Sequence, residues 1–410
     1  MLAFAIDERE IPLPDHRRRC RPLSGKGRYE DCKRQRGAHR GEHWLLLRCG
    51  RRPASNLLCT SEPGDSAASA GNLQSRENGG ARLFRVATFA AMNMFALLLV
   101  LAALQAQDST PPPLGRLVDI GGRRLHIRCT GSGSPAVITE SGSSSFSIEW
   151  ALVQDKVAGF TRICSYDRAG FAWSDRGPAE NTVEETMDDL HQLLRAAALK
   201  PPYVLVGHSI GGMYVQAYQR RYPEEVAGLV LVDATPEEDA EYLYNGKSTV
   251  GLTLSYDQLA SVYAPYIKNP PPPLELPTAV DTPYNKLSPE LQRAEVWAER
   301  LWRSRVDMPH SWITAESWKQ EFIALRRRRL AGPHGLGDLP LIVLRRGRRT
   351  TDVLNQREAD LVTLSSIGEL VVATESDHEI QLYQPDLVVQ AIRDVIGESH
   401  AHHGRSRNHL

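Results

Sequence analysis

The chain has 410 residues, which is enough for one large domain or two ordinary ones. Apolar residues make up 41% and charged residues 24%, the composition of a folded globular protein rather than of a disordered one. The formal net charge is +0, which excludes a global electrostatic argument for nucleic acid or an acidic partner.

Residues 1–80 depart from this average. They hold thirteen Arg and two Lys against ten acidic residues, with little helical or strand periodicity. Their four cysteines lack the Cys-x-x-Cys pairing of zinc sites, and a disulfide framework would require export. We therefore expect 1–85 to be a disordered basic leader, or to precede the true start of the protein. The four cysteines are Cys20, Cys32, Cys49 and Cys59.

An uncharged segment follows. Val86–Ala106 reads VATFAAMNMFALLLVLAALQA, 21 residues, and Arg82 and Arg85 stand just before it. About 20 apolar residues can span a bilayer, and preceding positive charge is also typical of a secretory signal. We predict a signal sequence or membrane anchor over 86–106 and a linker over 107–114. The remainder is then exported or anchored outside the cytoplasm, with membrane association through 86–106.

From Leu114 onward, short apolar runs alternate with helical patterns. Gly121-Gly122 between two such runs is typical of a hairpin. Strands that are apolar throughout indicate a parallel sheet covered by helices on both faces, so we predict an α/β fold with a mostly parallel sheet. The expected strands are 117–120, 125–129, 136–139, 162–166, 204–206, 229–232, 341–344 and 370–373; the expected helices are 183–198, 210–221 and 387–396.

We assign 115–233 and 340–397 to this α/β core. The stretch between them has no strong strand signal and is too long for a plain loop, so we predict a mostly helical cap over 234–339. Four tryptophans in it are expected to form the core of the cap. Residues 398–410 contain several histidines and are expected to be a disordered tail rather than a metal site. The tryptophans are Trp297, Trp302, Trp312 and Trp318.

The strongest motif is Gly207-His208-Ser209-Ile210-Gly211, between the apolar run YVLV and the helical pattern MYVQAYQRRY. A serine on a sharp strand-to-helix turn exposes its hydroxyl, and glycine on either side lets the chain turn without clashes. The pattern therefore predicts Ser209 as a nucleophile. We assign His208 no catalytic role, because its side chain is expected to pack away from the hydroxyl.

A serine nucleophile needs a base and an acid that orients the base. His378 follows the last predicted strand and precedes the closing helix, which is the expected place for the base. The acid is less clear. The stretch after LIVL has Arg and Thr where an acid is expected, with Asp352 arriving late, whereas Asp233 ends the strand LVLV near the nucleophile. We favour Asp233 and keep Asp352 as the alternative.

The oxyanion of a tetrahedral intermediate needs two hydrogen-bond donors. The backbone N–H of Ile210, directly after the nucleophile, is the first expected donor. The second is expected from the loop that follows the third strand, whose sequence ESGSSS allows close approach of the backbone. Within this loop we predict Ser143 as the donor.

Four stretches of the chain resemble the α/β-hydrolase fold-1 superfamily: RCTGSGSPAVITESG, SYDRAGFAWSDRGP, PPYVLVGHSIGGMYVQAYQRRYPEEVAGLVLVDATPEE and ESDHEIQLYQPDLVVQAI. Together they span about 115–397, with the cap only loosely matched. The resemblance implies an eight-stranded core sheet, a triad in the order Ser, acid, His, and no metal or organic cofactor. That order agrees with Ser209, Asp233 and His378. The missing acid after LIVL departs from the family pattern.

The family hosts many reactions, so the resemblance does not fix the substrate. Its haloalkane dehalogenases use an Asp nucleophile, where this chain has Ser209. We therefore expect an esterase- or peptidase-like serine hydrolase that cleaves an ester or amide bond of a small-molecule substrate through an acyl-enzyme. The alternative is a non-catalytic protein that binds a small molecule on the same fold. Nucleic-acid binding by the N-terminal arginines rests on composition alone, and we expect no such partner.

Overall fold

The computed structural model describes residues 110–177, 182–237, 241–245, 247–250, 253–268, 276–305, 308–332 and 334–407, all within one compact unit. The predicted leader (1–85) and the apolar segment 86–106 lie outside the described residues. In the described part of the chain, no helix is both long and apolar enough to cross a bilayer.

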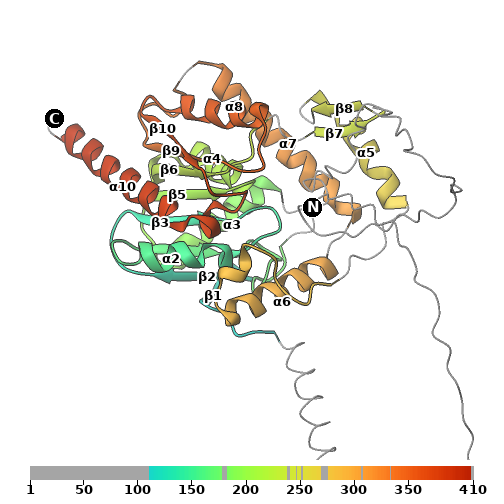
Figure 1. Ribbon diagram of the computed structural model, residues 1–410, viewed down its shortest axis with the longest axis horizontal. Helices are drawn as coiled ribbons and strands as arrows, with labels where there is room; N and C mark the ends of the chain where they lie inside the picture. Colours follow the sequence, from blue (N-terminus) through green and yellow to red (C-terminus); the bar gives the residue numbers. More distant parts are fainter. Residues whose placement is uncertain are drawn as a thin grey trace, which may run out of the picture. The chain divides into compact units, whose positions relative to one another are not determined.

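An eight-stranded sheet forms the centre of this unit, in the order β1-β2-β4-β3-β5-β6-β9-β10 (Figure 1). The pairs β1–β2 and β2–β4 are antiparallel, and the other neighbours are parallel. Every residue of β3 to β6 is buried, as expected for strands covered on both faces. The predicted mixed, mostly parallel eight-stranded sheet is confirmed. The strands are Arg116–Asp119, Arg124–Thr130, Ala136–Glu140, Ile163–Tyr166, Tyr203–His208, Val226–Val232, Leu341–Arg346 and Gly368–Ala373 for β1–β6, β9 and β10.

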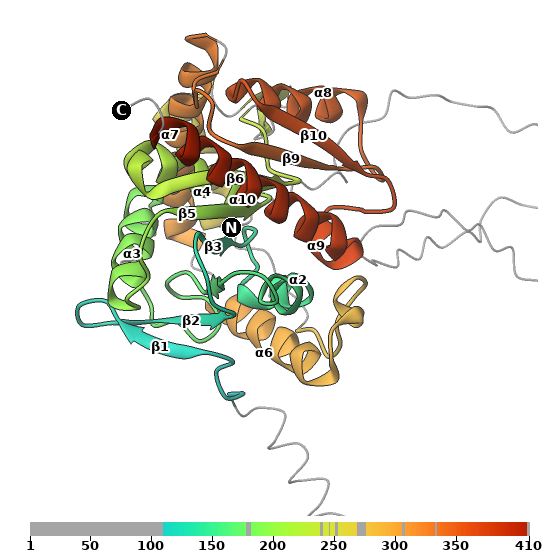
Figure 2. The same ribbon diagram turned by 90° about the vertical axis from the view of Figure 1, so that its left-hand side faces the viewer.

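Helices cover both faces of the sheet (Figures 1 and 2). Apolar residues of α2 and α10 pack on one face, in a cluster with the central strands. Residues of α3, α4 and α7 pack on the other. The helix α3 begins with a capping box, in which Thr182 and Glu185 each accept from the backbone N–H of the other. The helices are α2 Ala151–Val157, α3 Val183–Ala196, α4 Gly211–Arg221, α7 Met308–Leu330, α8 Asp352–Asp360, α9 Ile380–Tyr383 and α10 Pro385–Arg407.

The segment between β6 and β9 is mostly helical, but it differs from the expected cap in two ways. It contains an antiparallel pair, β7 and β8, that the sequence analysis missed. The second half of α7 also packs with the sheet core, because Trp318 is 1% exposed and donates from Nε1 to the hydroxyl of Tyr214 on α4 at 2.7 Å. The tryptophan therefore serves the core of the sheet and not a separate cap. The other elements are β7 Glu241–Tyr244, β8 Lys247–Val250, α5 Tyr256–Lys268 and α6 Pro289–Arg305.

The C-terminus also differs from the expectation. Residues 398–410 were expected to be a disordered tail, yet α10 continues to Arg407. Val395 and Ser399 are still buried along its inner face, and the hydroxyl of Ser399 donates to Ile396 O at 2.8 Å. Once a helix has formed, each further residue that becomes ordered adds one backbone hydrogen bond. A helix can therefore continue beyond the last residue that packs against the core.

Two further features bear on function. A disulfide joins Cys129 on β2 to Cys164 on β4, which face each other in the strand register. The loops after β3, β5, β6 and β10 leave the sheet at the carboxyl ends of its parallel strands. Ligands of open α/β sheets bind at this edge, so it is the place to look for a site.

We predict that a chain beginning at Asp108 folds and keeps full activity, because every core strand lies after Leu114. A chain beginning at Gly115 is the control. It lacks the carbonyl of Pro111, which accepts from Trp173 Nε1 at 2.8 Å, and the partly buried Leu114. Losing a hydrogen bond and part of an apolar side chain costs about 1–3 kcal/mol together. The melting temperatures of the two shortened chains are compared with that of the full-length protein. A chain from Asp108 that melts well below the full-length protein would contradict this boundary.

Candidate active site

Ser209 stands on the turn between β5 and α4. Its φ of +55° lies in the left-handed region, and its N–H donates to Val232 O at 3.1 Å. A Cβ at position 207 would lie 2.4 Å from Gly211 O, and one at position 211 would lie 2.5 Å from Glu140 O. Only glycine fits at positions 207 and 211. The close approach of neighbouring backbone therefore explains why the motif has glycine two residues before and two residues after Ser209.

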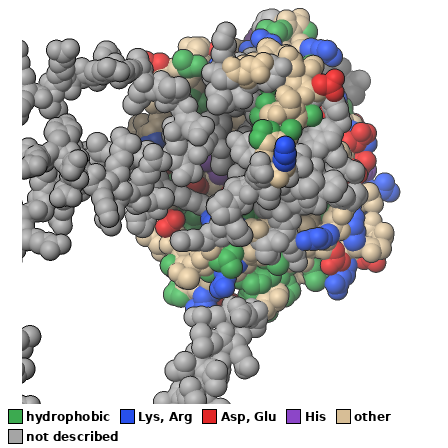
Figure 3. Space-filling model, turned by 90° about the vertical axis from the view of Figure 1, so that its right-hand side faces the viewer, with side chains coloured by type: hydrophobic (Ala, Val, Ile, Leu, Met, Phe, Trp, Pro, Cys, Tyr) green, Lys and Arg blue, Asp and Glu red, His purple; other side chains and the backbone are tan. Residues whose placement is uncertain are grey.

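His378 lies in the loop between β10 and α9. Its Nδ1 is 2.5 Å from Oδ2 of Asp233. The centroid of its ring is 4.6 Å from that of His208, the residue before Ser209. His378 therefore lies beside the turn that carries Ser209. Its side chain is 37% exposed. Figure 3 shows the face of the molecule on which some histidine surface is visible, next to acidic and basic side chains.

Asp233 ends β6 and is 3% exposed. Its Oδ1 accepts from the backbone N–H of Arg346 at 2.9 Å, and its Oδ2 lies 3.4 Å from Nε of the same residue. Burial alone would raise the pKa of Asp233, but the hydrogen bond and charge of His378, together with Arg346, hold it below its ordinary value. Asp352, the alternative acid, begins α8 with an exposed side chain. The acid that contacts His378 is Asp233.

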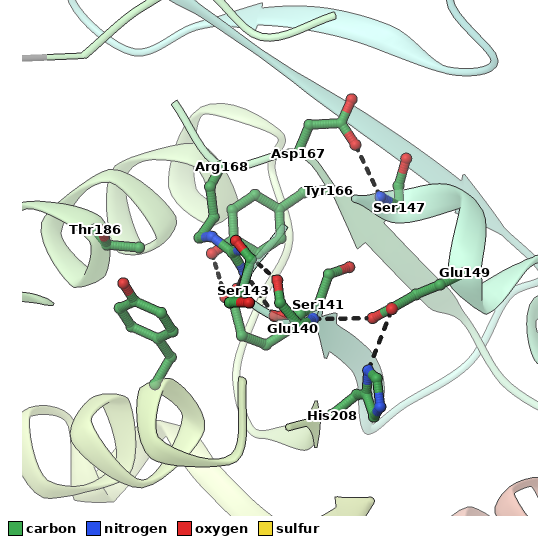
Figure 4. Close-up of polar contacts among 12 residues, drawn as sticks. Glu140, Ser141, Ser143, Ser147, Glu149, Tyr166, Asp167, Arg168, Thr186 and His208 are labelled. Atoms are coloured by element: carbon green, nitrogen blue, oxygen red, sulfur yellow. Dashed lines mark hydrogen bonds and ion pairs between the residues drawn. The ribbon is translucent and has the colours of Figure 1, made fainter. Parts of the chain in front are cut away.

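The loop predicted to supply an oxyanion donor lies directly over Ser209, the predicted nucleophile. A Cβ at Gly142 would be 3.6 Å from Cβ of Ser209. The guanidinium of the buried Arg168 donates to the carbonyls of Ser141, Gly142 and Ser143 at 2.6, 2.5 and 3.1 Å (Figure 4). In a planar trans peptide the carbonyl and the following N–H point in opposite directions. Arg168 therefore turns the N–H of Ser143 away from itself.

Arg168 is in turn held by an acid. Its Nη1 donates to Oε1 of Glu140 at 2.6 Å, and the other oxygen of this carboxyl accepts from the hydroxyl of Tyr166. Burial alone would lower the pKa of Arg168, but the charge of Glu140 raises it. A buried guanidinium that is paired and fully engaged with carbonyls fixes the loop in one conformation.

A second buried pair contacts the same loop from the other side. Oε1 of Glu149 accepts from Gly142 N at 3.1 Å, and its Oε2 lies 3.2 Å from Nδ1 of His208 (Figure 4). Nε2 of His208 is 3.1 Å from the carbonyl of His378. Burial alone would lower the pKa of His208, but the charge of Glu149 raises it. Both ring nitrogens of His208 therefore face acceptors, namely the carboxylate of Glu149 and the backbone carbonyl of His378.

The segment between β6 and β9 reaches this loop as well. The hydroxyl of Tyr284 is 3.3 Å from the hydroxyl of Ser145. Ala294 and Ala298 of α6 pack in one apolar cluster with Phe146, which follows the loop. The segment between β6 and β9 therefore packs against the loop that follows β3.

The sequence alone did not reveal the groups that hold the site together. Arg168 falls within the stretch SYDRAGFAWSD, and Glu140 and Glu149 are acids embedded in buried runs. Charged residues within apolar stretches of the sequence are the signal that could have identified them. Such residues are expected to be buried, and a buried charge requires a partner of opposite charge or a hydrogen bond. His208 was expected only to pack away from the hydroxyl of Ser209, and its contact with the backbone carbonyl of His378 was not foreseen. The partner itself could not be read from spacing, since Glu149 and His208 are 59 positions apart.

A family model described as "alpha/beta hydrolase fold" matches residues 140–333. An "AB hydrolase superfamily protein" of Gibberella zeae is 21% identical over 293 residues, which cover 64% of this chain and 86% of that protein. Among solved structures, an esterase from Thermogutta terrifontis aligns with a TM-score of 0.49 at 20% identity, over 68% of this chain and 94% of that one.

Other curated relatives match a shorter region. The "Probable transporter efuK" of Hormonema carpetanum is 37% identical over 131 residues, which are 30% of this chain and 18% of that protein. The chain spans less than half the length of several such relatives.

The position of the acid gives a direct prediction. Asp233→Asn should lower kcat by about four orders of magnitude, because an amide holds the wrong tautomer of the histidine. Asp352→Asn should stay near wild type, since its side chain is exposed at the start of α8. Steady-state kinetics on an activated ester compare the two. Loss of activity in Asp352→Asn alone would mean that the acid follows β9 after all.

Proposed function

We propose that the chain is a serine hydrolase of the α/β-hydrolase fold superfamily, which cleaves an ester or amide bond through an acyl-enzyme intermediate; the match of the family model to residues 140–333 and the eight-stranded sheet support this proposal. The observation that carries the proposal is the contact between Asp233 and His378 beside the strained turn of Ser209. A nucleophile, a base and an orienting acid at one sheet edge are the parts that acyl transfer requires.

In the proposed reaction, His378 takes the proton of the Ser209 hydroxyl as its Oγ attacks the substrate carbonyl. Asp233 remains ionised, because its pKa is held below the ordinary value, and stabilises the imidazolium. The backbone N–H groups of Ile210 and Ser143 bind the oxyanion. His378 then passes the proton to the leaving alcohol or amine, and water hydrolyses the acyl-enzyme by the same steps.

The orientation of the loop over Ser209 supports Ser143 as the second donor. Gly142 N is engaged by Glu149, whereas Arg168 draws the carbonyl of Gly142 and so directs the next N–H away from its own side. Donors that are fixed before the reaction avoid reorganisation when charge develops. The helix α4 also begins next to Ser209, and its N-terminus favours negative charge there.

We further propose that the hydrolase acts outside the cytoplasm on a small-molecule substrate. The apolar segment 86–106 supports export or anchoring, and the Cys129–Cys164 disulfide supports an oxidising compartment. The alternative, a non-catalytic binding protein on the same fold, would use the same site without turnover. A screen of p-nitrophenyl esters of graded chain length would define the acyl group.

Ser209→Ala should lower kcat by at least about a thousandfold, as expected for removing a triad nucleophile. It should also abolish labelling by a fluorophosphonate probe. Ser399→Ala, which removes a hydroxyl at the far end of α10, is the matched control and should label and turn over like wild type. Wild-type protein that neither labels nor hydrolyses any ester in the screen would favour the binding-protein alternative.

A further inference from the structure

Two buried residues, Glu149 and His208, lie between the loop after β3 and the loop of His378. Glu149 belongs to the short 3-10 helix η2, Ser147–Trp150, and His208 ends β5 directly before Ser209. The side chains are almost fully enclosed, since Glu149 is 0% exposed and His208 is 3% exposed. The acyl transfer proposed above uses neither side chain, although burying two titratable groups costs desolvation energy.

Three hydrogen bonds in succession connect the two loops through these residues. The backbone N–H of Gly142 donates to Oε1 of Glu149 at 3.1 Å, and Oε2 of Glu149 lies 3.2 Å from Nδ1 of His208 (Figure 4). Nε2 of His208 lies 3.1 Å from the carbonyl oxygen of His378. Gly142 precedes Ser143, the proposed oxyanion donor. The three bonds therefore begin beside one functional group of the site and end at the backbone of another.

The acceptors decide where the hydrogens of these bonds lie. The carbonyl oxygen of His378 can only accept, so Nε2 of His208 carries a hydrogen and donates it. A second hydrogen lies between Nδ1 and the carboxyl of Glu149. Burial alone would raise the pKa of Glu149 and lower the pKa of His208, but the charge of each residue on the other reverses both directions. The two residues therefore form an ion pair with the second hydrogen on the imidazole.

Packing holds the imidazole of His208 in this orientation. The ring of Trp150 meets it edge-on, with centroids 6.5 Å apart and an angle of 84° between the planes. Trp150 also donates from Nε1 to the hydroxyl of Ser141 in the loop after β3, at 3.1 Å. A Cβ at Gly142 would lie 3.1 Å from Nδ1 of His208, so the backbone of that loop packs directly on the imidazole. A rotation of the ring would therefore displace the loop as well.

We propose that Glu149 and His208 are positioning residues that act as one unit and set the distance between the oxyanion donor at Ser143 and the base His378. The inference rests on the proposed function, in which both groups act on the substrate. Because His208 is covalently joined to Ser209, the unit places both loops relative to the nucleophile. A misplacement of about 1 Å can lower a rate about a hundredfold, so breaking the unit should reduce turnover without removing a reacting group.

Substitutions that break or keep the hydrogen bonds test the proposal. Glu149→Leu and His208→Phe break them with side chains of similar size, and each should lower kcat about tenfold or more. KM should change little, because the oxyanion forms only in the transition state. Glu149→Gln can accept from Gly142 and donate to a neutral His208, so its kcat should exceed that of Glu149→Leu at least about fivefold.

A second His–Glu pair, away from the site, supplies a matched control. Nε2 of His191 on α3 lies 3.2 Å from Oε1 of Glu225. Glu225 ends η3, Pro223–Glu225, at the start of β6, whereas the site lies at the carboxyl end of that strand. His191→Phe removes a contact of the same length and should keep the kcat of wild type. Melting temperatures of all variants are measured beside the kinetics.

The double variant Glu149→Leu/His208→Phe tests whether the two residues act as one unit. One broken bond already separates the loops, so the double variant should lose no more kcat than the more impaired single variant. Losses that multiply would mean that the two residues act independently, and the proposed unit would be wrong.

Nitrogen NMR of the histidine side chains tests the hydrogen bonds without turnover. Nε2 of His208 should carry a hydrogen in wild type and in Glu149→Gln, and its signal is identified by its absence in His208→Phe. A bare Nε2 in wild type would overturn the proposal, even where Glu149→Leu fails to fold.

The kinetic outcomes separate this proposal from the proposed function. If wild type neither reacts with the fluorophosphonate probe nor hydrolyses an ester, the proposed function is wrong, and the positioning role with it. If wild type is active but Glu149→Leu and His208→Phe match His191→Phe in kcat, only the positioning role is wrong. Equal losses of kcat in Glu149→Gln and Glu149→Leu would also overturn it, because the hydrogen bonds would then make no difference.

Discussion

The site depends on the crowding of backbone at the turn of Ser209. Glycine at 207 and 211 lets the turn press against the carbonyl of Glu140 on the neighbouring strand, and a Cβ at 212 would lie 2.3 Å from Cβ of Ala234. The turn is therefore wedged between the loops that follow β3 and β6. The side chain of Ser209 is therefore held in one position, and the same contacts place the loop after β3 and Asp233 relative to it.

Two buried charge pairs hold the loops that meet at this turn. Arg168 with Glu140 fixes the carbonyls of the loop after β3, and Glu149 with His208 connects that loop to the backbone of His378. Such pairs add little net stability, because desolvation offsets most of their attraction. What they provide here is a defined geometry. Removing one partner leaves the other charge buried and alone, so each pair makes the arrangement of the site sensitive to substitution.

Two neighbouring strands, β6 and β9, together set the environment of Asp233. Asp233 at the end of β6 supplies the carboxylate, while β9 supplies Arg346, whose backbone N–H and guanidinium both face that carboxylate. The stretch after β9 is therefore cationic where an acid was expected, and it serves the acid of the neighbouring strand.

By itself, the sequence determined the apolar strands, the strand-turn-helix around Ser209 and the late position of His378, because hydrophobic periodicity and glycine spacing are local properties. It left Asp233 and Asp352 as alternatives and did not reveal the partners of Arg168 or Glu149. It also missed the β7–β8 pair and the packing of α7 on the core. These depend on contacts between residues far apart in the chain. Only the tertiary structure brings Asp233 to His378 across 145 positions, because the order of the strands in the sheet, and not spacing in the sequence, places the ends of β6 and β10 at one edge.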